Sequence, residues 1–242
     1  MRIAFLLFCA ATAAFADSAA AAPCNTEPDA ALPQYIVGYG SLMQDESRLR
    51  TSPRAGPAQP VEVSGYRRGW FARTPWSHFG TTFLGAVEDA AGRFNAVIYR
   101  VDADELAATD KRESGYCRAR VVPAAVRFLD PQSSAPASGE AWIYVLPAEA
   151  AGRAPDRAHP IVESYVDIFV SGCLEQEQRF HLQGFARECL SSTSAWSAHW
   201  VNDRIHPRRP FAYQPRAREI DRLLEAGLPR FYNRVRIESP TP

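Results

Sequence analysis

Residues 35–43 read Tyr-Ile-Val-Gly-Tyr-Gly-Ser-Leu-Met, and this segment constrains the fold more than any other. An apolar run that ends in Gly-Tyr-Gly-Ser predicts a strand, at about 34–39, that breaks into a tight loop. Glycine allows the backbone of such a loop to approach a ligand closely, so its N–H groups can form a cradle for an anion or a carbonyl. The alternative is a strand followed by an ordinary turn, and the segment alone does not decide between them.

The first residues have the pattern of an export signal. Arg2 provides a positive start, residues 3–16 are apolar or small with one exception, and an Ala-x-Ala cleavage site ends at Ala16. The apolar stretch is shorter than the roughly 20 residues that a membrane span needs. We therefore predict a signal peptide at 1–16, a flexible leader at 17–33, and a periplasmic or secreted protein without a membrane span.

The charge of the chain argues against nucleic acid as a partner. The 242 residues include 27 basic and 27 acidic side chains, so the formal net charge is zero. Non-specific binding to nucleic acid therefore has little electrostatic drive. A basic run at 204–210, preceded by Trp196 and Trp200, resembles a nucleic-acid patch, but its prolines favour a solvated loop or an anion contact.

Four cysteines follow the signal peptide, and an even number in an exported protein favours disulfides. Cys173 and Cys189 lie in adjacent helical patterns and form the preferred pair. A Cys24–Cys117 bridge would tie the N-terminal segment to the core, whereas a nucleophilic Cys117 is the less favoured alternative. No spacing of cysteine and histidine resembles a zinc site, so we expect no metal.

Hydrophobic patterning predicts a β-rich first half and a helical last third. A turn is expected at 90–92, and strand patterns lie at 61–63, 66–72, 81–87, 94–101, 117–129 and 141–146. Asp102 and Glu105 form a capping box for a helix that runs to about Glu113. Further helical patterns lie at 45–50, 160–174, 177–189 and 216–226.

The second informative segment is residues 110–116, which read Asp-Lys-Arg-Glu-Ser-Gly-Tyr. Asp110 and Glu113 are three residues apart and share one helix face. The helix dipole disfavours a glutamate in the last turn, so its presence there against local preference indicates a functional role. The alternative is a solvated Glu113 paired with its neighbour Arg112.

The two segments together resemble the γ-glutamylcyclotransferase family. A strand ending in Gly-Tyr-Gly-Ser-Leu is followed about 70 residues later by Asp-x-Arg-Glu-x-Gly-Tyr after a capped helix. The likeness is greatest to the AIG2-like branch that acts on glutathione and related γ-glutamyl compounds. It spans about residues 35–147 and extends to Gly65-Tyr66-Arg67-Arg68, residues 94–101 and Trp142-Ile143-Tyr144. Thr109 and Ser114 depart from the residues that the family often has at these positions.

The resemblance implies an α+β fold, with a mixed, barrel-like sheet and flanking helices at 34–147 and a mostly helical C-terminal extension at 148–242. It implies an enzyme that cyclises the γ-glutamyl group of a small amine or peptide, glutathione being one possibility, to 5-oxoproline with release of the amine. Glu113 would act as general acid and base. No metal or cofactor is implied, and the substrate-binding residues would be Tyr39, Gly40, Ser41, Leu42 and Tyr144.

Other functions fit the residues less well. Ser41 does not lie in a Gly-x-Ser-x-Gly sequence and has no evident His and Asp partners, which argues against a serine hydrolase. Asp110 and Glu113 come from one helix face and could hardly flank a glycosidic bond. The main alternative is a non-catalytic binding or interaction module on the same fold, although the presence of Glu113 argues against it. Its partner surface would be an aromatic face of the C-terminal helices, namely Tyr165, Phe169, Phe180 and Phe185, for which packing on the domain's own core is the favoured use.

Overall fold

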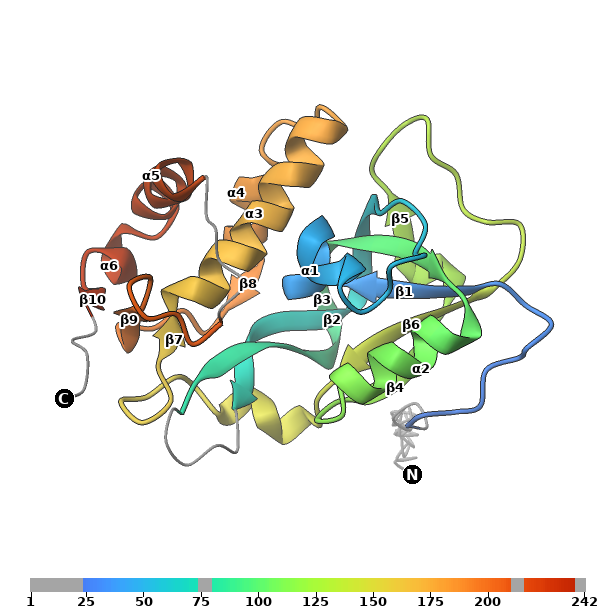
Figure 1. The fold of residues 1–242 in the computed structure, drawn as a ribbon, viewed down its shortest axis with the longest axis horizontal. Coiled ribbons are helices and arrows are strands. Elements are labelled where there is room, and N and C mark those ends of the chain that lie inside the picture. The colour runs from blue at the N-terminus through green and yellow to red at the C-terminus, as the bar shows by residue number, and fades with distance from the viewer. Residues whose placement is uncertain (1–23, 74–79, 210–215, 238–242) are drawn as a thin grey trace, which may run out of the picture.

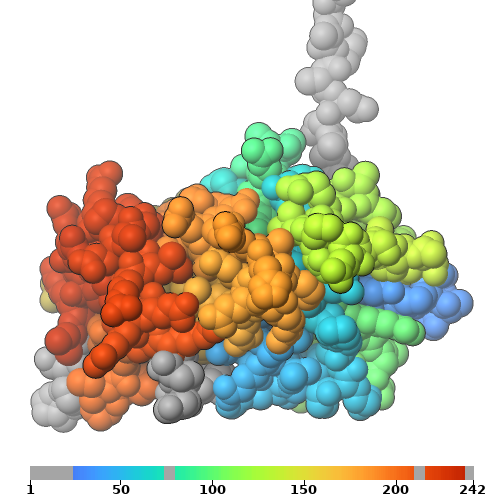
Figure 2. Space-filling view, turned by 90° about the horizontal axis from the view of Figure 1, so that it is seen from above, coloured from blue at the N-terminus to red at the C-terminus, as the bar shows by residue number. Residues whose placement is uncertain are grey.

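The computed structural model of the protein describes residues 24–73, 80–209 and 216–237. The predicted signal peptide at 1–16 lies outside the described residues. The molecule is elongated, with the main sheet toward one end and the C-terminal helices α5 and α6 at the other (Figure 1). A view from above shows the same order of segments along the long axis (Figure 2).

A curled, mixed sheet of seven strands forms the centre of the fold, which confirms the predicted α+β class. Its main path runs in the order β4 (Cys117–Val121), β6 (Glu140–Val145), β1 (Gln34–Gly38), β3 (Thr82–Val101), β2 (Gln59–Arg73) and β5 (Val126–Phe128). The short strand β8 (Thr193–Ser194) also pairs with β2. β1 is parallel to β6 and antiparallel to β3, so the predicted first strand lies inside the sheet.

The described residues form six α-helices, which include the C-terminal helices predicted from the sequence. They are α1 (Asp45–Leu49), α2 (Ala103–Arg112), α3 (Glu163–Arg179), α4 (Phe185–Ser191), α5 (Ala217–Gly227) and α6 (Pro229–Tyr232). A small parallel sheet joins the C-terminal region to the start of α3 and consists of β7 (Ile161–Val162), β9 (Trp200–Asn202) and β10 (Arg236–Ile237). Short 3-10 turns complete the chain at η1 (Ser41–Met43), η2 (Pro123–Ala125) and η3 (Ala148–Gly152).

Successive strand residues contribute to different buried clusters, because side chains of a strand alternate between the two faces of a sheet. In β1, Ile36 belongs to the cluster that contains residues of α2, α3, α4 and α5, whereas Val37 belongs to a second cluster. Tyr165, Phe169 and Phe185 lie in the first cluster and are at most 6% exposed. These three residues of the predicted aromatic face therefore pack on the core of the protein, whereas the fourth, Phe180, is half-buried and lies outside this cluster.

The predicted turn at 90–92 is a bulge within one long strand. Ser64 of β2 pairs with Arg93 of β3, and Tyr66 pairs with Glu88, so residues 89–92 have no ladder partner opposite Gly65. Gly65 has a φ of +85°, which glycine adopts without strain. The segments predicted as 61–63 and 66–72 are therefore one strand, and so are 81–87 and 94–101.

The long strand predicted at 117–129 is wrong, because the chain changes its position in the sheet within this segment. Pro123 starts η2, since proline has no N–H to donate to a ladder. β4 pairs with β6 before the break, and β5 pairs with β2 after it. The two halves consequently lie at the two ends of the main strand path.

The boundary between the first two C-terminal helices also differs from the prediction. Helix α3 runs through residues 175–178, which read Glu-Gln-Glu-Gln and are good helix formers, to Arg179. Helix α4 begins only after Gly184, whose φ is +84°. The predicted helix at 177–189 therefore spans the end of one helix, the connection and most of the next helix.

Residues 24–33, predicted as part of a flexible leader, are attached to the sheet. Cys24 forms a disulfide with Cys117 at the start of β4. The backbone N–H of Asn25 donates to the carbonyl of Arg118 at 2.9 Å. This part of the leader is held in place by covalent and hydrogen bonds to one edge of the sheet.

A second disulfide joins Cys173 of α3 to Cys189 of α4. Disulfides form and persist in oxidising compartments, so the two bridges are typical of a protein outside the reducing cytosol. Within the described ranges, no helix has the length and apolar character required to cross a membrane.

Candidate active site

The loop after β1 makes a tight turn that only glycine allows. A Cβ at Gly38 would lie 2.8 Å from the Cβ of Leu42, and a Cβ at Gly40 would lie 2.7 Å from the hydroxyl oxygen of Tyr165. The carbonyl of Gly40 accepts a hydrogen bond from the N–H of Met43 at 3.0 Å, which closes the 3-10 turn η1. The Gly-Tyr-Gly-Ser sequence is thus matched to a loop packed closely against β1 and α3.

This loop forms one wall of a small pocket that opens to solvent. The structure brings the residues that the sequence predicted for the site together on its lining, namely Tyr39, Gly40, Ser41, Leu42, Glu113 and Tyr144. The sequence did not predict the other lining residues, which are Val37, Leu84, Tyr116 and Tyr165. We call this space the inner compartment.

Glu113 occupies the C-cap position of α2, whose N-terminus has the predicted capping box. Its N–H donates to the carbonyl of Thr109 at 2.8 Å, and its side chain is only 17% exposed. Burial raises the pKa of Glu113, and the nearby guanidinium groups of Arg112 and Arg209 act in the opposite direction with smaller effect. Glu113 is therefore a largely buried carboxyl group with an increased proton affinity.

Arg112 connects Glu113 to the loop after β1. Its Nε is 3.1 Å from Oε1 of Glu113, and its Nη2 donates to Oγ of Ser41 at 2.9 Å. The other end of the guanidinium donates to the carbonyl of Ser47 at 2.8 Å and to Oγ1 of Thr51 at 2.9 Å. The rigid fork of an arginine can make such contacts simultaneously, so one side chain positions both walls of the pocket.

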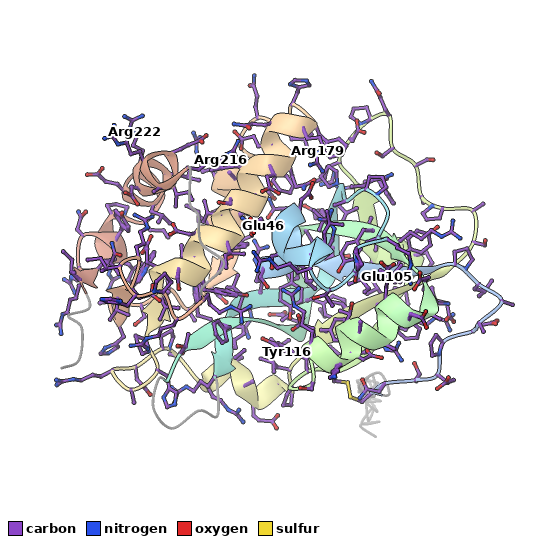
Figure 3. The ribbon with its side chains drawn as sticks, viewed as in Figure 1. Glu46, Glu105, Tyr116, Arg179, Arg216 and Arg222 are labelled. Atoms are coloured by element: carbon purple, nitrogen blue, oxygen red, sulfur yellow. A yellow bond between two sulfur atoms is a disulfide. The ribbon has the colours of Figure 1, made fainter. Side chains whose placement is uncertain are left out.

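Three of the four tyrosines that line the inner compartment donate their hydroxyl protons to protein acceptors. Tyr39 donates to the carbonyl of Tyr144 at 2.5 Å, Tyr144 donates to Oδ1 of Asp110 at 2.8 Å, and Tyr116 donates to the carbonyl of Leu84 at 2.9 Å. Burial is the main cause that raises the pKa of each of these three hydroxyls, so they remain protonated. Tyr116 lies beside the end of α2 (Figure 3).

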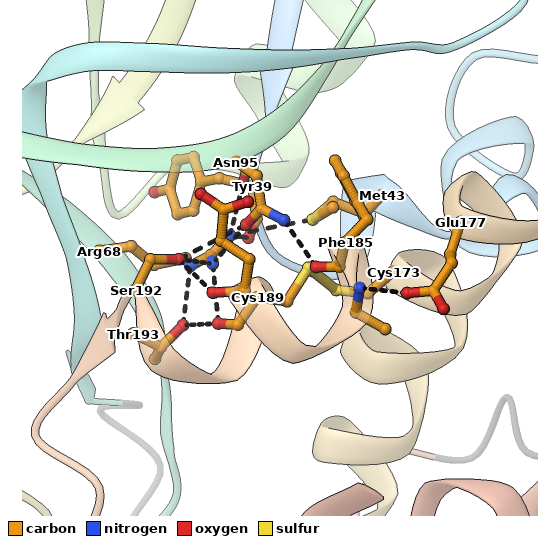
Figure 4. Close-up of a disulfide and its surroundings, with 12 residues drawn as sticks. Tyr39, Met43, Arg68, Asn95, Cys173, Glu177, Phe185, Cys189, Ser192 and Thr193 are labelled. Carbon is orange, nitrogen blue, oxygen red and sulfur yellow. Dashed lines mark hydrogen bonds between the residues drawn. A yellow bond between two sulfur atoms is a disulfide. The ribbon is translucent and has the colours of Figure 1, made fainter. Parts of the chain in front are cut away.

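A buried arginine supports the loop from behind. Arg68 has no exposed surface, and its Nη1 donates to the carbonyls of Tyr39 at 3.1 Å and Asn95 at 2.8 Å. Its Nη2 donates to the carbonyl of Cys189 at 2.9 Å, and its Nε donates to Oγ1 of Thr193 at 2.8 Å (Figure 4). Arg68 thus links the end of α4, next to the Cys173–Cys189 disulfide, to the start of the loop.

A second, outer compartment adjoins the first. Ser41, Glu113, Tyr116 and Tyr165 line both, so Glu113 lies where the two compartments meet. The remaining residues of the outer compartment are Ala72, Arg73, Phe83, Arg112, Gly115, Leu146, Arg153 and Arg209. Chemically, the site combines a carboxyl group of raised pKa with a glycine-containing loop, which suits proton transfer next to a bound carbonyl.

The sequence model of the family described as "Gamma-glutamyl cyclotransferase, AIG2-like" matches residues 36–164, which is just over half of the chain. The protein therefore belongs to this family, as the resemblance of its two segments predicted. Its members are enzymes, and the fold supports an activity of the γ-glutamyl cyclotransferase type. No curated protein sequence matches the chain.

Several solved structures are similar to this protein at low sequence identity. A γ-glutamyl cyclotransferase is 11% identical with a TM-score of 0.47, over 81% of this chain and 99% of that chain. The protein loc79017 from Homo sapiens is 13% identical with a TM-score of 0.43, over 63% and 85%. A γ-glutamyl cyclotransferase specific to glutathione from yeast is 10% identical with a TM-score of 0.38, over 67% and 97%.

Proposed function

We propose that the protein is an exported γ-glutamyl cyclotransferase that acts on a small γ-glutamyl amine or peptide, with Glu113 as general acid and base. The observation that supports this proposal best is the position of Glu113 where the two compartments meet, linked through Arg112 to the loop at Ser41. Residues 34–147 would form the catalytic domain and 148–242 an extension packed on it.

In the proposed reaction, the α-ammonium group of the substrate gives a proton to the carboxylate of Glu113, and the amine attacks the γ-carbonyl carbon. The attack is intramolecular, so holding the γ-glutamyl group in a folded conformation supplies much of the rate. Backbone N–H groups of residues 40–42 would bind the developing oxyanion or the α-carboxylate of the substrate. Tyr39 and Tyr144 would contact the bound γ-glutamyl group.

The second half of the reaction expels the amine. The ring nitrogen loses a second proton, the leaving nitrogen gains protons, and the bond between the γ-carbonyl carbon and that nitrogen breaks. Glu113 carries these protons, which requires it to reach both nitrogens. A carboxyl group whose pKa is raised above its ordinary value both accepts and returns a proton more readily near neutral pH than an ordinary glutamate.

The location of the protein is also part of the proposal. Residues 1–16 would direct export and be removed, and the two disulfides support a mature protein in an oxidising compartment. Glutathione is one candidate substrate, and other γ-glutamyl peptides and γ-glutamyl amines are the alternatives to test.

The test is to incubate the mature protein with a panel of γ-glutamyl peptides and amines, glutathione included, and to measure released 5-oxoproline. Glu113→Gln is expected to lower the rate by about a hundredfold or more, because it removes the acid–base group. Glu225→Gln, at an exposed position of α5, is the matched control and should behave as the wild type. Full activity of Glu113→Gln would show that the proposed mechanism is wrong. If the wild type releases no 5-oxoproline from any substrate, the proposal of an enzyme fails and the non-catalytic binding module becomes the favoured function.

A further inference from the structure

The outer compartment has an excess of positive charge. Four arginines line it, at positions 73, 112, 153 and 209, and Glu113 is the one acidic residue among its described lining residues. Asp156 forms an ion pair of 2.8 Å with Arg73. Even with Asp156 counted, the arginines outnumber the carboxylates by two. The excess favours an anionic occupant.

The arginines differ in what they contact. Arg112 holds Ser41 and Glu113, as described above, and Arg73 is paired with Asp156. Arg153 is exposed, so water and salt screen its charge. The guanidinium of Arg209 lies 5.5 Å from the ring centroid of Phe83 and is only partly exposed. A partly desolvated guanidinium binds an anion more strongly than an exposed one, and the charge of Arg209 acts on Glu113, so Arg209 is a candidate for ligand binding.

The backbone next to Arg209 is anchored to the start of α3. The N–H of Arg209 donates to Oγ of Ser164 at 3.2 Å, and the N–H of Arg208 donates to Oδ2 of Asp203 at 2.7 Å. The same carboxylate accepts a hydrogen bond from Oγ of Ser164 at 2.7 Å. Asp203 is 2% exposed and Ser164 is fully buried, so this anchor belongs to the folded core.

The direction of the substrate follows from the position of Glu113. Under the proposed function, Glu113 exchanges protons with both the attacking and the leaving nitrogen. If the inner compartment holds the γ-glutamyl group against the loop, the leaving amine extends past Glu113 into the outer compartment. Arg209 lines that compartment, and its charge acts on the carboxyl group of Glu113, so it is placed to meet the amine half of the substrate.

We infer that Arg209 is a specificity-determining residue that binds an anionic group, in the simplest case a carboxylate, on the amine half of the γ-glutamyl substrate. The inference rests on the proposed function and extends it to a substrate class. Arg209 lies outside the residues 36–164 that match the family. The C-terminal extension of this chain would thus contribute directly to substrate recognition.

The experiment compares γ-glutamylglycine with γ-glutamylglycinamide, which differ in the charge of the leaving group. For the wild type, kcat/KM should favour the carboxylate substrate by about tenfold to a hundredfold, as expected for a charge-assisted hydrogen bond. Arg209→Gln should abolish this preference, chiefly through a higher KM for γ-glutamylglycine, and Arg209→Lys should retain part of it. Arg222→Gln on the exposed surface of α5 is the control and should keep the preference (Figure 3).

Binding to Glu113→Gln, measured by calorimetry with the same two ligands, separates this inference from the proposed function. Binding that favours γ-glutamylglycine and depends on Arg209, without turnover by the wild type, would support the inference and overturn the proposed reaction. The inference would be overturned if the wild type turned over both substrates with equal kcat/KM, or if Arg209→Gln lowered kcat/KM equally for both. The proposed reaction would stand in either case. If the protein shows neither binding of these ligands nor turnover, both the inference and the proposed reaction are wrong.

Discussion

Nη2 of Arg112 donates a hydrogen bond of 2.9 Å to Oγ of Ser41, a residue 71 positions earlier in the chain. The same guanidinium has its Nε 3.1 Å from the carboxylate of Glu113. The loop after β1 and the end of α2 are therefore joined by one side chain. Because the two predicted site segments meet through Arg112, this residue offers the most direct way to disturb their geometry without removing Glu113.

Arg112→Gln is expected to lower kcat by about tenfold to a hundredfold, since it removes a charge-assisted contact from Glu113. Arg112 opposes the effect of burial on the pKa of Glu113. Its loss should raise that pKa further and shift the acidic limb of the pH–activity profile to higher pH. The measurement is kcat as a function of pH for wild type and variant.

Lys111→Gln is the matched control for Arg112→Gln, because Lys111 is the preceding residue on α2 and is exposed. It should leave the acidic limb where the wild type has it. An unshifted acidic limb in Arg112→Gln would show that Arg112 does not act on Glu113. Arg112→Lys should have an intermediate effect, because an ammonium group cannot make all the contacts of the fork.

Glu113 is expected to lower the stability of the folded protein at neutral pH. Its folded pKa is raised above the ordinary value of 4.5, so the folded state binds a proton more tightly than the unfolded state. This favourable contribution is fully present below the unfolded pKa and is lost as pH rises through the folded pKa. Glu113→Gln should therefore have a higher Tm than the wild type above the folded pKa, and the difference should shrink toward acidic pH. A difference in Tm that does not change with pH would contradict the raised pKa.

The site residues that could be predicted from the sequence are those with a strong local signal. Gly40 and Ser41 stand where an apolar strand breaks, and Glu113 stands at a helix end that disfavours its charge. The basic run at 204–210, which contains Arg209, is predicted from the sequence as a solvated loop or an anion contact. Its position beside the site has no local signal, because it depends on how the C-terminal region folds back over β3 and α3. The contact from Arg68 to the carbonyl of Cys189 spans 121 residues and could not be predicted for the same reason.

The errors in the predicted fold have a similar origin. Residues 90–92 are turn formers, but such residues suit a β-bulge as well as a hairpin turn. The pairing of β3 with β2 decides between the two structures. Pro123 was assigned to a strand because the residues on both sides are strand formers. Whether the residues before and after Pro123 pair with the same strand or with different strands depends on contacts with β6 and β2, which are distant in sequence.

Gly40→Ala tests whether the close packing of the loop is required. The new Cβ would lie 2.7 Å from the hydroxyl oxygen of Tyr165, so one of the two must move. The free energy of unfolding should fall by about 1–3 kcal/mol, as for other overpacked sites, and kcat/KM should fall with it. Tyr165→Phe in the same chain removes the overlapping oxygen and should restore part of the stability.

Gly152→Ala is the control for Gly40→Ala, because a Cβ at Gly152 would meet nothing within 4 Å apart from its neighbours in the chain. Thermal unfolding and kcat/KM of the two alanine variants and of the double variant provide the comparison. If Gly40→Ala and Gly152→Ala are equally stable, the contact with Tyr165 does not restrict the loop.

Arg68→Lys should destabilise the protein, although it conserves the charge. The five donors of the guanidinium serve the carbonyls of Tyr39, Asn95 and Cys189 and the hydroxyl of Thr193, and a lysine nitrogen cannot reach them all. Unsatisfied buried carbonyls and a displaced buried charge should cost about 3–5 kcal/mol of the free energy of unfolding, measured with denaturant. Arg67→Lys is the control, since Arg67 has a side chain that is 40% exposed and pairs with Asp89 on the surface, where such pairs contribute less than about 1 kcal/mol. A difference of under about 1 kcal/mol between the two lysine variants would mean that the network around Arg68 does not stabilise the loop that carries Tyr39.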